Sequence, residues 1–111
     1  MKNDDWGLDP QVQFIRRLFT GMEKAQGDFF KALGLSPFDQ RLGPWRQAAL
    51  HLFDKVWALS ARQCTPLEEK DIVQIYLHCL VTVTSRQNMA VPEGLFLGND
   101  LIIKWIKEVE S

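Results

Sequence analysis

The side chains able to do chemistry in this 111-residue chain are two histidines, two cysteines and a few clustered carboxylates. His78 and Cys79 are adjacent in the sequence, which raises the question of whether they act as a base and a thiol nucleophile. On a helix, however, successive residues point about 100° apart, so the imidazole is poorly placed to bond to the sulfur. We therefore interpret Cys79 as a small buried hydrophobic residue and His78 as part of a polar stripe.

A metal or haem site would require His51 and His78 to meet across two helices. No carboxylate or thiolate stands at ligand spacing from either histidine, so the sequence predicts neither a metal site nor a cofactor. A disulfide between Cys64 and Cys79 fails on distance, because fifteen helical residues span roughly 22 Å and a disulfide needs Cα atoms within about 7 Å. We expect both cysteines to be free thiols.

The clustered carboxylates have a structural explanation. Glu68, Glu69 and Asp71 fall in the first turns of a predicted helix, where the helix dipole favours negative charge without any catalytic role. No glycine-rich phosphate loop follows a strand, and no Ser, His and Asp set has a diagnostic spacing. The sequence therefore predicts a protein that is not an enzyme.

Charge and composition exclude further classes. The formal charge is −1 and the pI is near 6.1, without the clustered basic face that nucleic-acid binding needs. A helix-turn-helix with QCTP as its turn would present Gln74, His78 and Thr82 but no central Arg or Lys, so we expect no nucleic acid. The N-terminus lacks the apolar core of a secretory signal, and no run approaches the ~18 apolar residues of a membrane span. With two cysteines, this predicts a cytoplasmic protein without a membrane anchor.

Helix signals recur along the chain. Asp9 before Pro10 is a typical helix start, and Gly34 stands where a left-handed C-terminal cap is expected. Thr65 and Glu68 match a capping box around Pro66. Between the first two signals, one helical seam is polar only at Gln26. Its members are Val12, Ile15, Phe19, Met22, Gln26, Phe29 and Leu33.

The stretch from Asp71 to Ser85 is ambiguous. Its β-branched residues alternate as in a strand. Its polar residues instead recur every three or four positions, which is the period of one narrow wet stripe on a helix. We predict a helix that is buried on nearly every side. The polar residues are Asp71, Gln74, His78, Thr82 and Ser85.

These patterns predict an all-α fold, a compact bundle in a single domain over residues 1–111. The four main helices are expected at about 10–33, 44–62, 66–87 and 99–110, with a short helical turn within the 36–42 connector. Phe19, Phe29, Phe53 and Trp105 are assigned to the core. Trp6, Phe38, Trp45 and Phe96 lie outside or at the ends of the periodic segments, where aromatic residues either pin loops or anchor partners.

The second and third helices carry more apolar surface than four helices easily hide. We therefore expect a small adaptor or regulatory subunit that binds a protein partner or a second copy of itself, most simply as a homodimer. The alternative is a bundle that carries a small hydrophobic ligand in its core. The predicted partner-binding residues are Trp45, Leu50, Trp57, Val73, Leu77, Val81, Met89 and Phe96.

Overall fold

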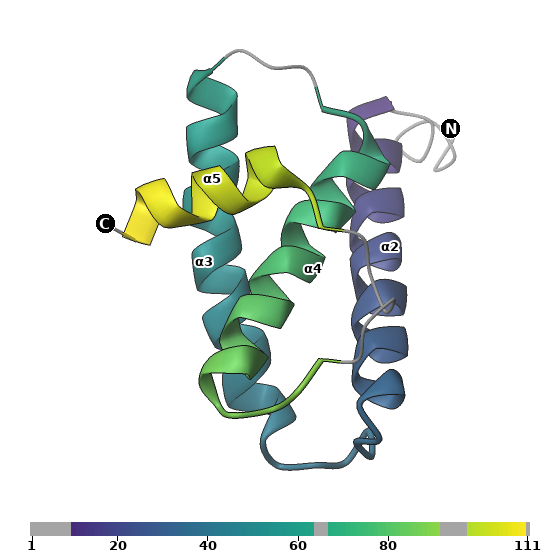
Figure 1. The fold of residues 1–111 in the computed structure, drawn as a ribbon. Coiled ribbons are helices and arrows are strands. Elements are labelled where there is room, and N and C mark those ends of the chain that lie inside the picture. The colour runs from purple at the N-terminus through teal and green to yellow at the C-terminus, as the bar shows by residue number, and fades with distance from the viewer. Residues whose placement is uncertain (1–9, 64–66, 92–97, 111) are drawn as a thin grey trace, which may run out of the picture.

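The prediction of a four-helix, all-α chain is confirmed. A computed structural model describes residues 10–63, 67–91 and 98–110, and these residues form helices without any strand. In chain order the helices are α2 (Pro10–Ala32), α3 (Leu42–Arg62), α4 (Glu69–Arg86) and α5 (Asp100–Glu110), shown in Figure 1. None of the described helices is both long enough and apolar enough to cross a lipid bilayer.

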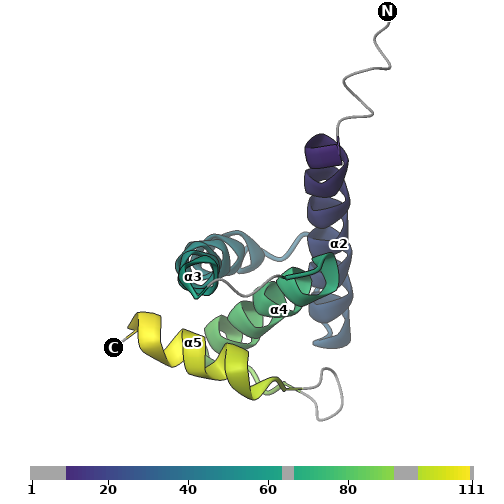
Figure 2. The same cartoon turned by 90° about the horizontal axis from the view of Figure 1, so that it is seen from above.

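Helix α4 is the centre of the arrangement. It packs against α2, α3 and α5, whereas α5 also packs on α3. Figure 1 shows α4 between α3 and α2, with α5 lying across α3 and α4, and Figure 2 shows the same order from above. Within the described ranges the backbones of α2 and α3 do not approach each other closely, so the two helices are joined mainly through α4.

The ambiguous stretch lies within α4, so its polar period predicted the correct structure. Two threonines of this helix, half-buried Thr82 and buried Thr84, bond to carbonyls of the preceding turn. Thr82 Oγ1 donates to His78 O at 2.8 Å, and Thr84 Oγ1 donates to Leu80 O at 2.9 Å. These bonds satisfy the hydroxyls without leaving the helix. The buried residues of α4 are Ile72, Ile75, Tyr76, His78, Cys79, Leu80, Val83 and Thr84.

One member of the predicted wet stripe is fully buried, and it attaches α5 to α4. His78 is buried, and its Nε2 accepts a hydrogen bond from the Asn99 backbone N–H at 3.0 Å, while Nδ1 lies 2.9 Å from Gln74 O. Both contacts fit a neutral ring that carries its proton on Nδ1. Asn99 in turn caps α5, because its Oδ1 accepts from the N–H groups of Leu101 and Ile102.

The face of α2 that meets α4 explains the one polar residue in the first helical seam. Tyr76 on α4 donates its hydroxyl to Gln26 Oε1, so the amide has a partner inside the interface. One turn earlier, a Cβ added at Gly21 would lie 3.3 Å from Val73 Cγ2. The absence of a side chain at Gly21 therefore allows the two helices to approach closely.

Two helix ends use a left-handed residue. Gly34 has φ 80°, and the N–H groups of Gly34 and Leu35 bond to the carbonyls of Lys31 and Phe30, which is the Schellman pattern. Asn88 has φ 62° and ends α4 in the same way, with Met89 N–H bonded to Thr84 O. The cap at Gly34 was predicted, and the cap at Asn88 was not.

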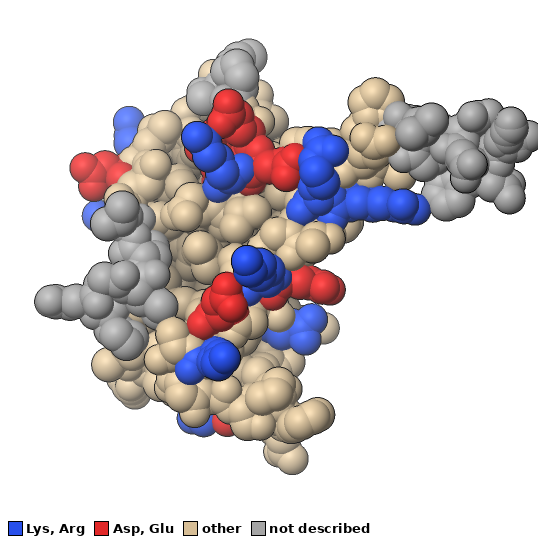
Figure 3. Space-filling view, turned by 90° about the vertical axis from the view of Figure 1, so that its right-hand side faces the viewer, with Lys and Arg blue, Asp and Glu red and all other residues tan. Residues whose placement is uncertain are grey.

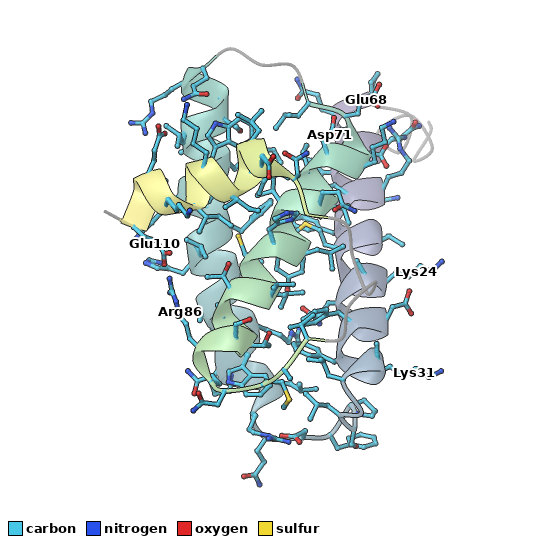
Figure 4. The ribbon with its side chains drawn as sticks, in the orientation of Figure 1. Lys24, Lys31, Glu68, Asp71, Arg86 and Glu110 are labelled. Atoms are coloured by element: carbon cyan, nitrogen blue, oxygen red, sulfur yellow. The ribbon has the colours of Figure 1, made fainter. Side chains whose placement is uncertain are left out.

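The start of α4 differs from the prediction. The capping residue is Glu68 rather than Thr65, and the Glu68 N–H donates to Asp71 Oδ2 at 3.1 Å. The helix thus begins at Glu69, after the predicted Pro66, which lies outside the described residues. Figure 4 shows Glu68 and Asp71 at this end of α4, and at the other end Arg86 beside Glu110 of α5, with which it forms an ion pair.

Helix α3 begins two residues before the predicted Pro44, and the connector contains hydrogen-bonded turns within the predicted 36–42 range. The Asp39 N–H bonds to Ser36 O at 3.0 Å, and Arg41 binds the Asp39 carboxylate with both its backbone N–H and its guanidinium. These hydrogen bonds from Arg41 hold the pKa of Asp39 down at about 2.

Two glycines of α2 provide a matched test of the α2–α4 contact. Gly27→Ala meets nothing within 4 Å, and we expect it to raise the free energy of unfolding by about 0.5–1 kcal/mol through helix propensity. Gly21→Ala has the same propensity gain but presses on Val73, so its gain is smaller or negative. Urea unfolding of both variants measures the difference, and equal gains would show that the contact at Gly21 is loose.

His78 predicts a dependence of stability on pH. Burial lowers the pKa of His78 from its ordinary value of 6.5, opposed by the hydrogen bond to Gln74. The unfolded chain therefore binds this proton more readily, so stability from this residue is complete above about pH 6.5 and is lost as the pH falls below it. We expect urea unfolding between pH 7 and 5 to show this loss in the wild type and in His51→Gln, whose histidine is exposed. The loss should be absent in His78→Gln, and equal losses in all three would contradict the assignment.

Candidate functional site

An apolar groove opens between the first half of α2 and the second half of α3. Its volume is about 630 Å³. One side chain of its lining, Asp54, is ionisable, and most of the others are aliphatic or aromatic. The lining residues are Pro10, Gln11, Phe14, Ile15, Leu18, Phe19, Phe53, Asp54 and Trp57.

The groove exists because α2 and α3 diverge. At the end near their connector, the rings of Phe30 and Trp45 lie 6.4 Å apart and close the space between the helices. Toward its N-terminus α2 stands away from α3, which is clear in Figure 2. The apolar side of α2 then loses its neighbour, so Ile15 is 48% exposed and Phe19 58% exposed.

The opposite wall belongs to the core. Phe53 is buried and makes edge-to-face contacts with Trp57 and Tyr76, at centroid distances of 5.2 and 5.9 Å. Leu18 at the base of the α2 wall is also buried. Such aromatic pairs have a preferred geometry and hold each other in place. The groove therefore has a fixed aromatic wall on α3 and a more exposed wall on α2.

Chemically, this lining suits binding rather than reaction. It contains no thiol, hydroxyl, imidazole or amine that could act as a nucleophile or base. Gln11 and Asp54 are its polar groups, and both are exposed. An occupant would be held mainly by its apolar surface.

Outside the groove, the adjacent residues His78 and Cys79 are both buried in the core. His78 has the backbone partners described above, and burial raises the pKa of Cys79 to about 12, which disfavours the thiolate. His51 is exposed on α3. Within residues 10–63, 67–91 and 98–110, no three His, Cys, Asp or Glu side chains gather where they could hold a metal ion. Cys64 lies outside the described residues.

Of the residues predicted to bind a partner, Trp57 lies in the groove. Leu50 is 40% exposed and stands seven positions before Trp57, which places it on the same side of α3. The assignment of Trp45 to a partner-binding surface is wrong, because this residue is only 8% exposed and packs on Phe30 in the core. We expected a tryptophan near the start of a helix to be available for a partner, yet here its ring lies beside the ring of Phe30 and the guanidinium of Arg41.

The remaining predicted residues lie elsewhere. Val73 on α4 is half-buried near Gly21, and Leu77 and Val81 are half-buried along α4. Val81 lines a separate small pocket against α5, and Met89 follows the end of α4, half-buried against the core. Phe96 lies outside the described residues. The predicted set is therefore not one surface, because α2 and α5 cover much of α4.

The sequence analysis missed the α2 wall. Phe19 was assigned to the core and Ile15 to the buried seam, but both are exposed in the groove. The predicted helices at 10–33 and 66–87 are nearly equal in length and gave no signal for this, whereas the helices of the structure differ. A helix of 23 residues is about 34 Å long, whereas one of 18 residues is about 27 Å long. One end of α2 can therefore extend past its support on α4.

Charge on the visible faces is mixed. Figure 3 views the α2 side, where Lys and Arg lie among Asp and Glu without a broad field of one sign. Lys24 and Lys31 of α2 point outward in Figure 4. Arg17 of α2 binds Glu69 at the start of α4, at 2.5 Å. This distribution adds no support for a phosphate-binding face on this side.

Comparisons with known proteins found no match to this chain among family models, curated proteins or solved structures.

The two walls of the groove should contribute unequally to stability. Phe53→Ala removes a buried ring, and we expect it to lower the free energy of unfolding by about 3–5 kcal/mol. Phe19→Ser changes a residue that is already 58% exposed, and we expect a loss below about 1 kcal/mol. Urea unfolding monitored by circular dichroism measures both. Comparable losses would mean that Phe19 belongs to the core.

Proposed function

We propose that this protein is a small, non-enzymatic interaction module, an adaptor or regulatory subunit, whose groove holds an apolar helix of a partner protein. The observation that carries this proposal is the exposure of Ile15 and Phe19 on one wall of an apolar groove with a fixed aromatic wall opposite. Large apolar side chains left in water beside a groove are typical of binding sites. Aromatic residues are also the commonest energetic anchors of interfaces.

The dimensions favour a helical occupant. From Pro10 to Phe19 the α2 wall runs about 14 Å, which is about two and a half helical turns. That length accommodates anchors at positions i, i+4 and i+7 of an amphipathic helix, the usual spacing of helix-in-groove binding. Leu50, which is 40% exposed, offers a further apolar side chain on the same side of α3 as Trp57. If the partner is a second copy of this chain, the same groove would form the interface of a homodimer.

A carrier of a small hydrophobic ligand is the second candidate. The volume of about 630 Å³ falls within the range of ordinary ligand pockets. An open groove with two exposed side chains suits a longer occupant better, so we rank this function second. For either function we place the protein in the cytoplasm, where a chain with few cysteines keeps them reduced.

The test combines capture with variants of the groove. Tagged wild type, Phe19→Ser and Phe38→Ser are purified from the native host at moderate salt, and the bound proteins are identified by mass spectrometry. Phe38 is the control because it is 91% exposed in the α2–α3 connector, away from the groove. We expect a stoichiometric partner with wild type and with Phe38→Ser, reduced at least tenfold with Phe19→Ser.

A contact readout makes the test decisive. A photo-crosslinking amino acid at position 19 should trap the partner, and the same amino acid at position 38 should not. Native mass spectrometry then separates the alternatives, since a doubled mass identifies a homodimer and a small retained adduct identifies a ligand carrier. Capture that is insensitive to Phe19→Ser, with no crosslink from position 19, would refute a role for the groove.

A further inference from the structure

A second pocket lies where α2 ends and α3 begins, and we call it the connector pocket. Its volume is about 560 Å³, which is typical of a site for a small molecule. Its apolar lining comes from α2, the connector and α3, and consists of Phe30, Leu35, Pro37 and Leu42. The connector pocket and the groove have no lining residue in common.

Hydrogen-bonded turns hold the apolar walls of the connector pocket in place. The Leu35 N–H donates to Phe30 O at 3.0 Å, so the chain reverses over the last turn of α2. The Leu42 N–H donates to Asp39 O at 3.2 Å at the start of α3. Phe30 and Leu42 are both buried. A ligand would therefore find the apolar part of this pocket already formed.

The charged groups of the connector pocket are both cations. Lys31 and Arg46 belong to its lining, and none of the lining residues is a carboxylate. Within the described residues, neither cation is paired with a carboxylate. Lys31 lies at the rim, because its side chain points outward in Figure 4. The charge of the pocket is therefore complementary to an anion.

Gln26 adds a donor whose orientation is fixed. Tyr76 donates its hydroxyl to Gln26 Oε1, and burial raises the pKa of Tyr76 to about 12 against the opposing charge of Arg46. The phenol thus remains a donor at neutral pH, and Gln26 Nε2 must turn elsewhere. Among the described residues no buried side-chain nitrogen lacks a partner, and no bond uses this Nε2. It is therefore open to solvent, and Arg46 is within electrostatic range of it.

Gly27 leaves space beside the connector pocket. It lies in the interior of α2, where glycine is less favourable than alanine. A Cβ built at Gly27 would meet nothing within 4 Å, whereas one at Gly21 would meet Val73. Packing within the described chain therefore gives no reason for a glycine at position 27. Because Gly27 lines the pocket, an occupant of the pocket would supply that reason.

We infer that the connector pocket binds a small carboxylate with an apolar tail. The carboxylate lies between Gln26 and Arg46, and the tail lies on the apolar lining. A guanidinium can bind a carboxylate through two parallel hydrogen bonds, and Lys31 adds positive charge at the rim. This site goes beyond the proposed function, because it requires neither the groove nor a partner protein.

Three probes separate the contribution of the head from that of the tail. Octanoate, octanol and acetate are titrated into the full-length chain, with calorimetry and NMR of labelled Ile and Leu methyl groups as readouts. We expect octanoate to bind and to shift the methyl signals of Leu35 and Leu42. Octanol should bind about tenfold more weakly, and acetate should cause no shift. Equal binding of octanoate and octanol, or shifts confined to Ile15 and Leu18 in the groove, would overturn the inference.

Charge variants test the position of the carboxylate. Arg46→Gln should weaken octanoate binding about fivefold or more, and it should leave octanol binding unchanged. Lys24→Gln is the control, because Lys24 is an exposed lysine of α2 outside the pocket lining. It should leave octanoate binding unchanged. Equal effects of Arg46→Gln and Lys24→Gln would mean that only the overall charge of the protein matters, and this result would reject the site.

Filling the pocket from Gly27 tests the position of the tail. Gly27→Leu places a branched side chain in space that is now empty, and we expect octanoate binding to fall about tenfold or more. Gly27→Ala adds one methyl group and should have a much smaller effect. Leucine and alanine both favour a helix over glycine, so thermal unfolding should show that both variants are at least as stable as wild type. Unchanged octanoate binding by folded Gly27→Leu would refute the site.

Discussion

The burial of α4 on three sides is the constraint on which the rest of the structure depends. This helix has too few polar residues for a solvated face, so α2, α3 and α5 must each cover part of it. Packed helices stand about 8–10 Å apart. Two helices that both lie on a third are thus held apart unless their own side chains bridge the gap. Phe30 and Trp45 bridge it near the connector, and beyond them the groove is the space that remains.

The polar groups of α4 specify how its neighbours dock. His78 accepts the Asn99 N–H and so fixes the start of α5, whereas Tyr76 donates to Gln26 and fixes the depth of α2. Burial raises the pKa of Tyr76 to about 12, which keeps the phenol protonated as a donor. Among the described residues, no buried side-chain nitrogen or oxygen lacks a hydrogen-bond partner. Because an unmatched polar group would be costly in this core, these bonds oppose other registers of α2 and α5.

The sequence predicted the helices well and the exposed surface poorly, for a physical reason. Periodicity shows which residues share a face, and that was enough to identify α4 as a helix from its polar stripe. It does not show how far along that face a neighbour extends. Ile15 and Phe29 lie in the same seam, yet Phe29 is buried and Ile15 is not. The difference arises from the neighbouring helices, which cover one end of the seam and not the other. The prediction for Trp45 was wrong in the opposite sense, since its ring packs on Phe30 of another helix, and periodicity within one helix does not show that contact.

The energetics of the groove set a lower limit on the size of its occupant. Ile15 and Phe19 are about half exposed, so complete burial of both would contribute about 2–3 kcal/mol, and an occupant's own apolar residues would contribute about as much. A total near 5 kcal/mol corresponds to a dissociation constant of a few hundred micromolar. That affinity is weak for a free partner. A stably bound partner must therefore bury more than these two side chains, and Trp57 and Leu50 on the facing side of α3 are the apolar residues nearest to hand for it.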